Sequence, residues 1–212
     1  MEKTTLDLEN EIYQLIGRAL TEWSKVEETL SGLFALATIQ RVDDKIGPAA
    51  CAFWAVLSFD AKLRMTDAAL TFRLSDHEAL MTEWHSLKKS LSKKAKKRAE
   101  LAHGTVARWT FTNPKTKEKE VGSFFAPSLY KQVNAKSDSS LRVRVMITTS
   151  GDTRPEGRLD KEDIEERIGG FQKTKKRLQT FHGLAYRELE QRQKASDEAF
   201  AKLTATEPCT AP

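Results

Sequence analysis

The chain has 212 residues, of which 39% are hydrophobic, and this is enough to bury a core and excludes an intrinsically disordered protein. There is no run of about eighteen apolar residues and no basic-then-apolar leader, so we expect a cytoplasmic protein with no membrane partner. The formal net charge of +5 permits a polyanionic partner, whereas Cys51 and Cys209 give neither a disulfide framework nor the spacing of a metal site.

The most regular hydrophobic pattern lies in residues 8–38, where apolar side chains recur at alternating spacings of three and four. This pattern predicts one amphipathic helix that packs in a bundle. Residues 43–48 interrupt it, and Pro48 suits the first turn of a new helix. A second helix is predicted over residues 49–72, with its apolar side chains facing inward.

A third helix is predicted to begin after Ser75 or Asp76, either of which can cap it, and to continue to Leu101. Gly104 is expected to end this helix by adopting the left-handed conformation. Seven of the eleven residues from Lys88 to Arg98 are cationic, and the helix dipole favours cations at this end.

The pattern changes after Gly104. Residues 106–111 and 120–125 flank the turn-forming sequence Asn-Pro-Lys-Thr-Lys, which favours a β-hairpin. Residues 141–148 alternate polar and apolar side chains and predict a further strand, with loops at residues 134–140 and 150–157.

Asp160 and Asp163 are expected to open the last helix, whose inner stripe ends near Leu189 and fades after Gln193. The Gly169-Gly170 pair inside it suggests close packing or a kink, because each glycine costs about 1 kcal/mol relative to alanine.

These elements predict a mainly α protein, an antiparallel bundle of about four long helices with a small antiparallel β-sheet inserted between the third and last long helices. We expect the bundle to comprise residues 1–104 and 158–195 and the insertion to comprise residues 105–157. Residues 196–212 are predicted to form a disordered tail.

The end of the third helix carries Arg98 and His103 in the sequence R-A-E-L-A-H-G. Five residues along an uninterrupted helix correspond to a rotation of about 140°, so the two side chains share a cleft only if the helix stops. We expect Gly104 to provide that stop.

An arginine, four intervening residues and a histidine resemble the signature of HEPN domains, small helical bundles many of which are metal-independent ribonucleases of bacterial toxin and defence systems. The resemblance extends to Trp23, to Glu27 and to residues 59–63, and it covers roughly the first half of the chain and the final helix. It implies that two Arg98–His103 pairs meet in one cleft of a homodimer. It further implies RNA as the partner, a cognate antitoxin or other partner protein, and no metal or other cofactor.

In such a ribonuclease the 2′-hydroxyl of the RNA attacks the adjacent phosphate. Arg98 would stabilise the developing charge through its planar guanidinium, and His103 would act as general acid or base. Glu27 could pair with Arg98 and orient it. Five lysines would hold backbone phosphates: Lys89, Lys93, Lys94, Lys96 and Lys97.

Simpler interpretations of the same residues stay open. His103 can bind the terminal carbonyls of its helix, and Arg98 can pair with Glu27 or Glu100. Active members of the family usually have a polar residue after the arginine, and Ala99 therefore favours a noncatalytic HEPN-like dimeric binding or regulatory module that has lost nuclease activity. In a third interpretation the protein has neither function, and the basic run is a solvated face.

The other histidines and the tryptophans give weaker indications of function. His77, His85 and His182 lack zinc-ligand spacing, and His182 could face either the core or the cleft. Among the four tryptophans, Trp109 on the predicted hairpin is the best candidate for an exposed base-stacking side chain.

Overall fold

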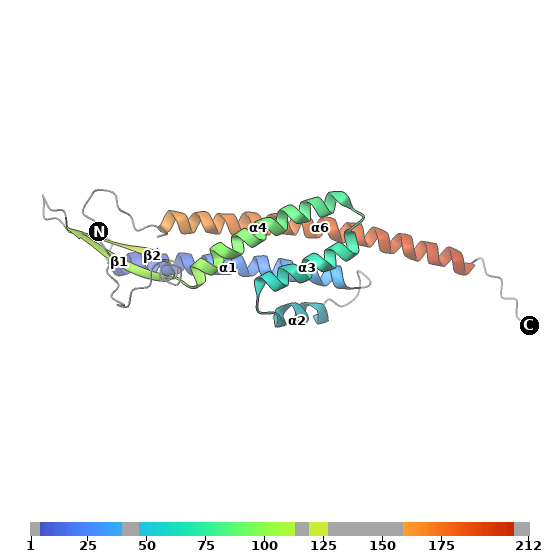
Figure 1. Ribbon diagram of the computed structural model, residues 1–212, viewed down its shortest axis with the longest axis horizontal. Helices are drawn as coiled ribbons and strands as arrows, with labels where there is room; N and C mark the ends of the chain where they lie inside the picture. Colours follow the sequence, from blue (N-terminus) through green and yellow to red (C-terminus); the bar gives the residue numbers. More distant parts are fainter. Residues whose placement is uncertain (1–4, 40–46, 113–118, 127–158, 206–212) are drawn as a thin grey trace, which may run out of the picture. The chain divides into compact units, whose positions relative to one another are not determined.

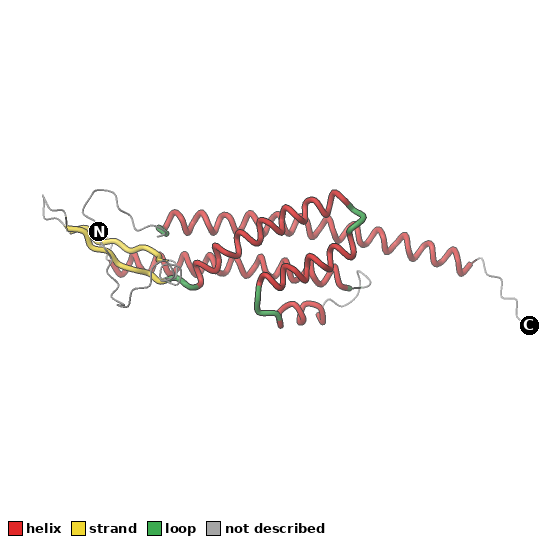
Figure 2. Tube along the Cα trace, viewed as in Figure 1, coloured by secondary structure: helices red, strands yellow, loops and turns green. Residues whose placement is uncertain are grey.

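A computed structural model describes residues 5–39, 47–112, 119–126 and 159–205 (Figure 1). Within these residues the chain forms five helices and one two-stranded antiparallel sheet, which lies between α4 and the last long helix in the sequence (Figure 2). The predicted fold class, a mainly α helical bundle with a small inserted sheet, is confirmed.

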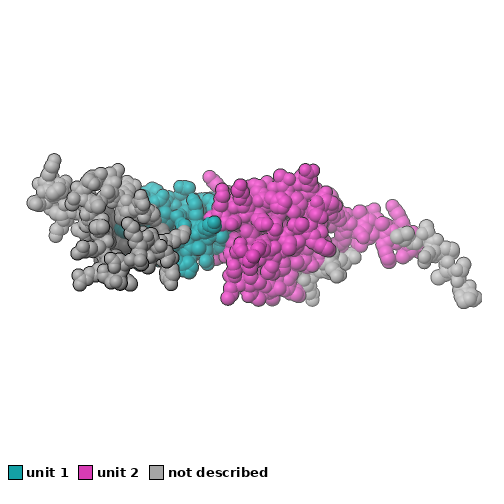
Figure 3. All heavy atoms as spheres, viewed as in Figure 1, with its two compact units in different colours: residues 1–23, 94–171 teal, residues 24–93, 172–212 magenta. Residues whose placement is uncertain are grey.

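The described residues belong to two compact units, coloured separately in Figure 3. Unit 1 is drawn from Met1–Trp23 and Lys94–Phe171, and unit 2 from Ser24–Lys93 and Gln172–Pro212. The three long helices, α1 (Thr5–Thr38), α4 (Glu78–Ala102) and α6 (Lys161–Ala205), each contribute residues to both units.

Unit 1 is built on the apolar stripes of its helical segments. Ile12, Leu15 and Trp23 of α1 are buried, as are Ile164 and Phe171 of α6. The rings of Trp23 and Phe171 meet edge to face at 5.3 Å. The spacing of three and four that predicted these helices therefore produces the observed core.

The predicted hairpin is present in unit 1. Strand β1 (Thr105–Thr112) pairs with β2 (Lys119–Ala126) in a register that sets Thr105 opposite Ala126. Phe125 and Leu159 exchange backbone hydrogen bonds of 2.9 and 2.8 Å. These bonds attach the hairpin to Leu159, which lies two residues before α6. The expected strand at residues 141–148 and the loops at residues 134–140 and 150–157 lie outside the described residues.

Unit 2 contains α2 (Gly47–Ala55) and α3 (Phe59–Leu74) together with segments of the three long helices. Trp84 of α4 packs on Phe181 of α6 with ring centroids 5.7 Å apart. Its indole N–H donates to Asp67 at 2.9 Å, so this fully buried tryptophan has its polar atom satisfied.

The single helix predicted over residues 49–72 is wrong, because it is two helices. The N–H of Val56 bonds the carbonyl of Phe53, which closes α2 in a tight turn. Ser58 then caps α3 by accepting a hydrogen bond from the N–H of Ala61 at 3.4 Å. Apolar side chains continue through the break, and the hydrophobic pattern therefore conceals it.

The predicted cap of α4 is also wrong. Ser75 is the C-cap of α3, and the residue that precedes α4 is His77. Its Nδ1 accepts the N–H of Leu80 at 3.3 Å, a role that sequence rules assign to serine or aspartate.

The start of α6 is confirmed as a reciprocal cap. The N–H of Asp163 donates to the Asp160 carboxylate at 2.9 Å, and the N–H of Asp160 donates to the Asp163 carboxylate at 3.1 Å. Of the two explanations for the glycine pair, close packing applies at Gly170, where the Lys94 side chain lies against the helix.

The helix α6 continues to Ala205, so the disordered tail predicted from residue 196 is helical as far as that residue, and residues 206–212 lie outside the described chain. Residues 196–205 contain good helix formers and neither glycine nor proline.

The left-handed conformation expected at Gly104 is wrong. Its φ lies outside the left-handed range, and glycine is required because the Phe125 ring and the carbonyl of Ala126 approach it closely. A Cβ at this position would lie 2.7 Å from that carbonyl and closer still to the ring.

We predict that Gly104→Ala lowers the free energy of unfolding by about 1–3 kcal/mol, because the added methyl overpacks the contact with Phe125. Gly17→Ala is the matched control, since nothing lies within 4 Å of its Cβ position in α1, and it should stabilise by about 1 kcal/mol. Urea unfolding of both variants measures the difference. Equal effects of the two substitutions would contradict the close approach at Gly104.

Candidate functional site

The last turns of α4 in unit 1 present an exposed ridge. Lys96 and Ala99 are exposed on α4, and His103, which follows its last residue Ala102, is exposed as well. The N–H of His103 still donates to the carbonyl of Ala99 at 3.2 Å, so the helical bonding pattern reaches the histidine. A lysine and an imidazole are therefore both accessible to solvent near the end of α4.

Arg98 belongs to a different side of α4. It shares an inward-facing row with Lys94 and with Leu101, which is only 2% exposed. Arg98 itself is half-buried, and its Nε is buried without a hydrogen-bond partner. A buried donor without a partner is uncommon in folded proteins, in which most buried polar groups are hydrogen-bonded.

The helix stop on which the expected convergence of Arg98 and His103 depends is present. α4 ends at Ala102, between the two residues, although the N–H of His103 still donates to the carbonyl of Ala99. Among the described residues, no hydrogen bond or ion pair joins the two side chains.

Glu27, the residue expected to orient Arg98, is engaged elsewhere in unit 2. Its carboxylate accepts a hydrogen bond from Lys62 at 3.0 Å. Lys62 is 5% exposed, and its ammonium also lies 4.4 Å from the centre of the Trp54 ring and 5.1 Å from that of Phe53. Glu27 is thus the counterion of a buried lysine.

Glu100, the other expected partner of Arg98, pairs with Arg167 of α6 at 2.9 Å. The same guanidinium donates to the carbonyl of Lys97 at 3.0 Å, so Arg167 joins α4 to α6 within unit 1. Sequence reasoning missed this arginine, because nothing in its spacing along α6 indicates a partner on another helix.

The five lysines proposed to hold phosphates differ in exposure. Lys89 and Lys93, in unit 2, are exposed, as is Lys96 in unit 1. Lys94 and Lys97 are half-buried, the former against Gly170. The structure therefore leaves three of the five fully available to a ligand. Trp109 lies on β1, but its side chain is outside the described residues.

Lys88 begins the basic run and is occupied by the protein itself. It donates to the Asp67 carboxylate, which also accepts from the Trp84 indole. Burial raises the pKa of Asp67, but the hydrogen bonds from Lys88 and Trp84 outweigh it and hold the pKa below its ordinary value of 3.8.

His182 lies beside a cavity in unit 2 and not in the core. The cavity has a volume of about 200 Å³ and is lined by Thr29, Gly32, Gln179 and His182. Burial lowers the pKa of His182 below 6.5, and a hydrogen bond with the backbone of Gly32 opposes this shift. The histidine is therefore neutral at pH 7.

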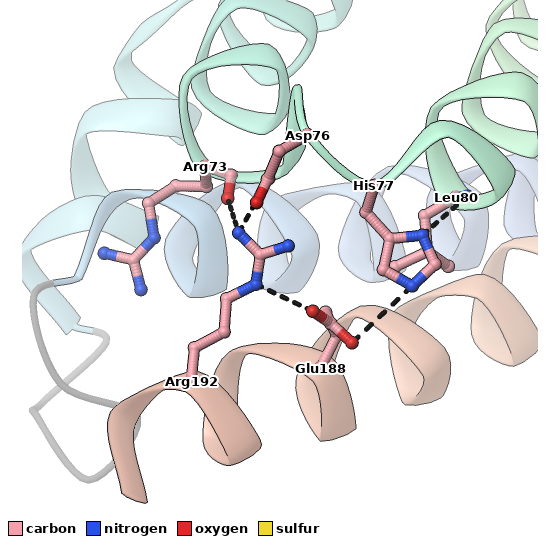
Figure 4. A network of polar contacts seen from close by, with 6 residues as sticks. All are labelled: Arg73, Asp76, His77, Leu80, Glu188 and Arg192. Atoms are coloured by element: carbon pink, nitrogen blue, oxygen red, sulfur yellow. Dashed lines mark hydrogen bonds and ion pairs between the residues drawn. The ribbon is translucent and has the colours of Figure 1, made fainter. Parts of the chain in front are cut away.

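A polar network centred on Arg192 was not predicted (Figure 4). Arg192 donates to Asp76 at 2.8 Å, to the carbonyl of Arg73 at 3.2 Å and to Glu188 at 2.7 Å, while the second oxygen of Glu188 lies 3.6 Å from Nε2 of His77. The hydrogen bond from Arg192 lowers the pKa of Asp76, and hydrogen bonds with Asp76 and Glu188 raise that of Arg192. Only the spacing of Glu188 and Arg192, one helical turn apart, was a signal available in the sequence.

The described residues contain no group of three or more histidine, cysteine, aspartate or glutamate side chains able to hold a metal ion. Of the helices in the described part of the chain, none combines the length and the apolar character needed to cross a membrane. Comparison with protein-family models, curated proteins and solved structures found no match to the chain.

We predict that Glu27→Ala lowers the free energy of unfolding by about 3–5 kcal/mol, because it leaves the Lys62 ammonium buried without a counterion. The double variant Glu27→Leu/Lys62→Met should recover most of the loss, since it removes both charges. Chemical denaturation measures each variant. A Glu27→Ala protein as stable as the wild type would show that the pair is not structural.

We also predict that His182 makes stability depend on pH. Its pKa is lowered in the folded state, so below pH 6.5 the unfolded chain binds the proton more readily, and stability falls as the pH falls toward the folded-state pKa. His182→Gln should flatten this part of the curve, whereas His85→Gln, which alters an exposed histidine, should not. Thermal unfolding between pH 5 and 8 measures the effect, and identical curves for the three proteins would contradict it.

Proposed function

We propose that the protein is a noncatalytic, HEPN-like RNA-binding module, in which the exposed end of α4 binds backbone phosphates. The single observation that carries the proposal is the arrangement of charge on α4. Lys96 and His103 are exposed, whereas Arg98 is half-buried and its Nε is buried. An exposed cation can neutralise a phosphate, whereas a half-buried one reaches it only after rearrangement.

Ribonuclease chemistry requires more than this surface provides. An arginine must touch the same phosphate whose ester oxygens exchange protons with the histidine. Within one chain, Arg98 and His103 share no hydrogen bond or ion pair and the Nε of Arg98 is buried, so the proposal does not assign both groups to one phosphate. The presence of Ala99 on the exposed side, between Lys96 and His103, agrees with a surface that binds without catalysis.

The lysines supply affinity without sequence specificity. Lys96 in unit 1, and Lys89 and Lys93 in unit 2, are exposed and lack the rigid donor fork with which arginine reads planar groups. Contacts of this kind position a nucleic acid through its backbone and are sensitive to salt. The proposal therefore includes weak discrimination between RNA sequences. A cognate antitoxin or other protein partner stays part of the proposal as a regulator.

We predict that the chain binds single-stranded RNA and that Lys96→Glu weakens the affinity severalfold. The slope of log K against log salt should fall by about 0.7 for each phosphate that the variant no longer neutralises. Lys173→Glu, the same charge reversal at an exposed lysine of α6, is the control and should have a smaller effect. Fluorescence anisotropy with a labelled oligonucleotide at several salt concentrations measures both. If the wild type fails to bind, or if the two variants are equally affected, the proposal is wrong.

A second candidate, a metal-independent endoribonuclease, is favoured by one observation: His103 is exposed while the Nε of Arg98 has no partner. In a dimer, Arg98 and His103 of one copy would then act on RNA together with the same two residues of the second copy. This candidate requires that RNA be cleaved in the presence of chelator and that His103→Ala abolish the cleavage. The noncatalytic module leaves bound RNA intact in both proteins.

A further inference from the structure

The outer side of α2 exposes apolar residues to solvent. Only Phe53 of this helix is fully buried, while Trp54 is 46% exposed and Leu57, two residues beyond the helix, is 97% exposed. We use the name α2 surface for five exposed residues: Cys51, Ala52, Trp54, Ala55 and Leu57. All of them belong to unit 2.

The α2 surface also lacks charge. Residues 47–58 contain no Asp, Glu, Lys or Arg, although such residues make up 31% of the chain. Another uncharged run, residues 29–39, is mostly buried in unit 2, so its composition is explained by folding. Folding does not explain an uncharged run whose residues face water.

Trp54 is held in place by the protein. Its ring meets Phe53 edge to face at 5.6 Å and lies 4.4 Å from the ammonium of Lys62. Glu27 neutralises that ammonium at 3.0 Å, so no unbalanced charge lies beneath the surface. An ordered, partly exposed tryptophan in uncharged surroundings is the kind of residue that dominates protein–protein binding energy.

The charge pattern selects the partner. A charged protein surface placed on α2 would lose its hydration without gaining a counterion. An anionic membrane is not favoured either, because the charged residues that precede the run, Arg41, Asp43, Asp44 and Lys45, carry no net charge and form no basic cluster. A two-fold axis brings identical residues of two chains together. Like charges would repel each other across such an axis, whereas a surface without charge avoids this repulsion.

We propose that two copies of this chain associate through their α2 surfaces around a two-fold axis, with Trp54 and Leu57 at the centre. The proposal does not rest on RNA binding. It also differs from the dimer that the family resemblance implies, in which the Arg98–His103 pairs meet, because those two residues belong to unit 1.

Sedimentation equilibrium of the full chain over a range of concentrations tests the proposal. The wild type should dimerise, and Leu57→Glu should raise the dissociation constant of the dimer by roughly tenfold or more, because it buries a carboxylate at the centre of the interface. Leu57 is 97% exposed, so its replacement leaves the fold of the chain intact. The matched control is Phe200→Glu, at a position of α6 that is 69% exposed, and it should leave the dimer unchanged.

Cys51 gives a second readout, since its exposed thiol lies within the α2 surface. In a Cys209→Ser background, a short bismaleimide should link two chains through Cys51, and the Leu57→Glu substitution should suppress the product. A monomer at every concentration, a dimer unaffected by Leu57→Glu, or equal dissociation by Phe200→Glu would each overturn the proposal. RNA affinity is measured separately, so loss of the dimer and loss of RNA binding can be told apart.

Discussion

The difference in exposure between the side chains at the end of α4 is the constraint on which the functional interpretation depends. The helix ends at Ala102, and the hydrogen bond from the N–H of His103 to the carbonyl of Ala99 holds the backbone of His103 against its last turn. Lys96 and His103 are exposed, whereas Arg98 is half-buried and its Nε is buried. Two residues that look catalytic in the sequence therefore differ in their exposure to solvent.

Other charged residues form ion pairs within the protein, so fewer charged side chains are accessible to a ligand. Glu27 neutralises the buried Lys62, Glu100 pairs with Arg167, and Lys88 pairs with Asp67. A buried cation that loses its counterion destabilises the fold by several kcal/mol, so such residues have little freedom to act on a substrate. Lys89, Lys93 and Lys96 are exposed, and the proposed RNA contacts rest on them.

Much of the fold could be predicted from the sequence, because the spacing of apolar residues along α1 and α6 and the turn residues of the hairpin are local signals. The break between α2 and α3 could not, since apolar residues run through it and the cap is a single serine, Ser58. The site was less predictable. Which carboxylate meets Lys62 or Arg167 depends on how separate helices pack, and the need for glycine at Gly104 arises from Phe125, a residue of another element.

The central claim, that His103 and Arg98 act apart, is tested most directly by following both side chains in one titration. In an ¹⁵N-edited NMR experiment with a short single-stranded RNA, the account predicts that the His103 imidazole signals shift on binding while the buried Nε of Arg98 does not. A simultaneous shift of the Arg98 Nε and His103 signals, saturating at the same RNA concentration, would contradict it.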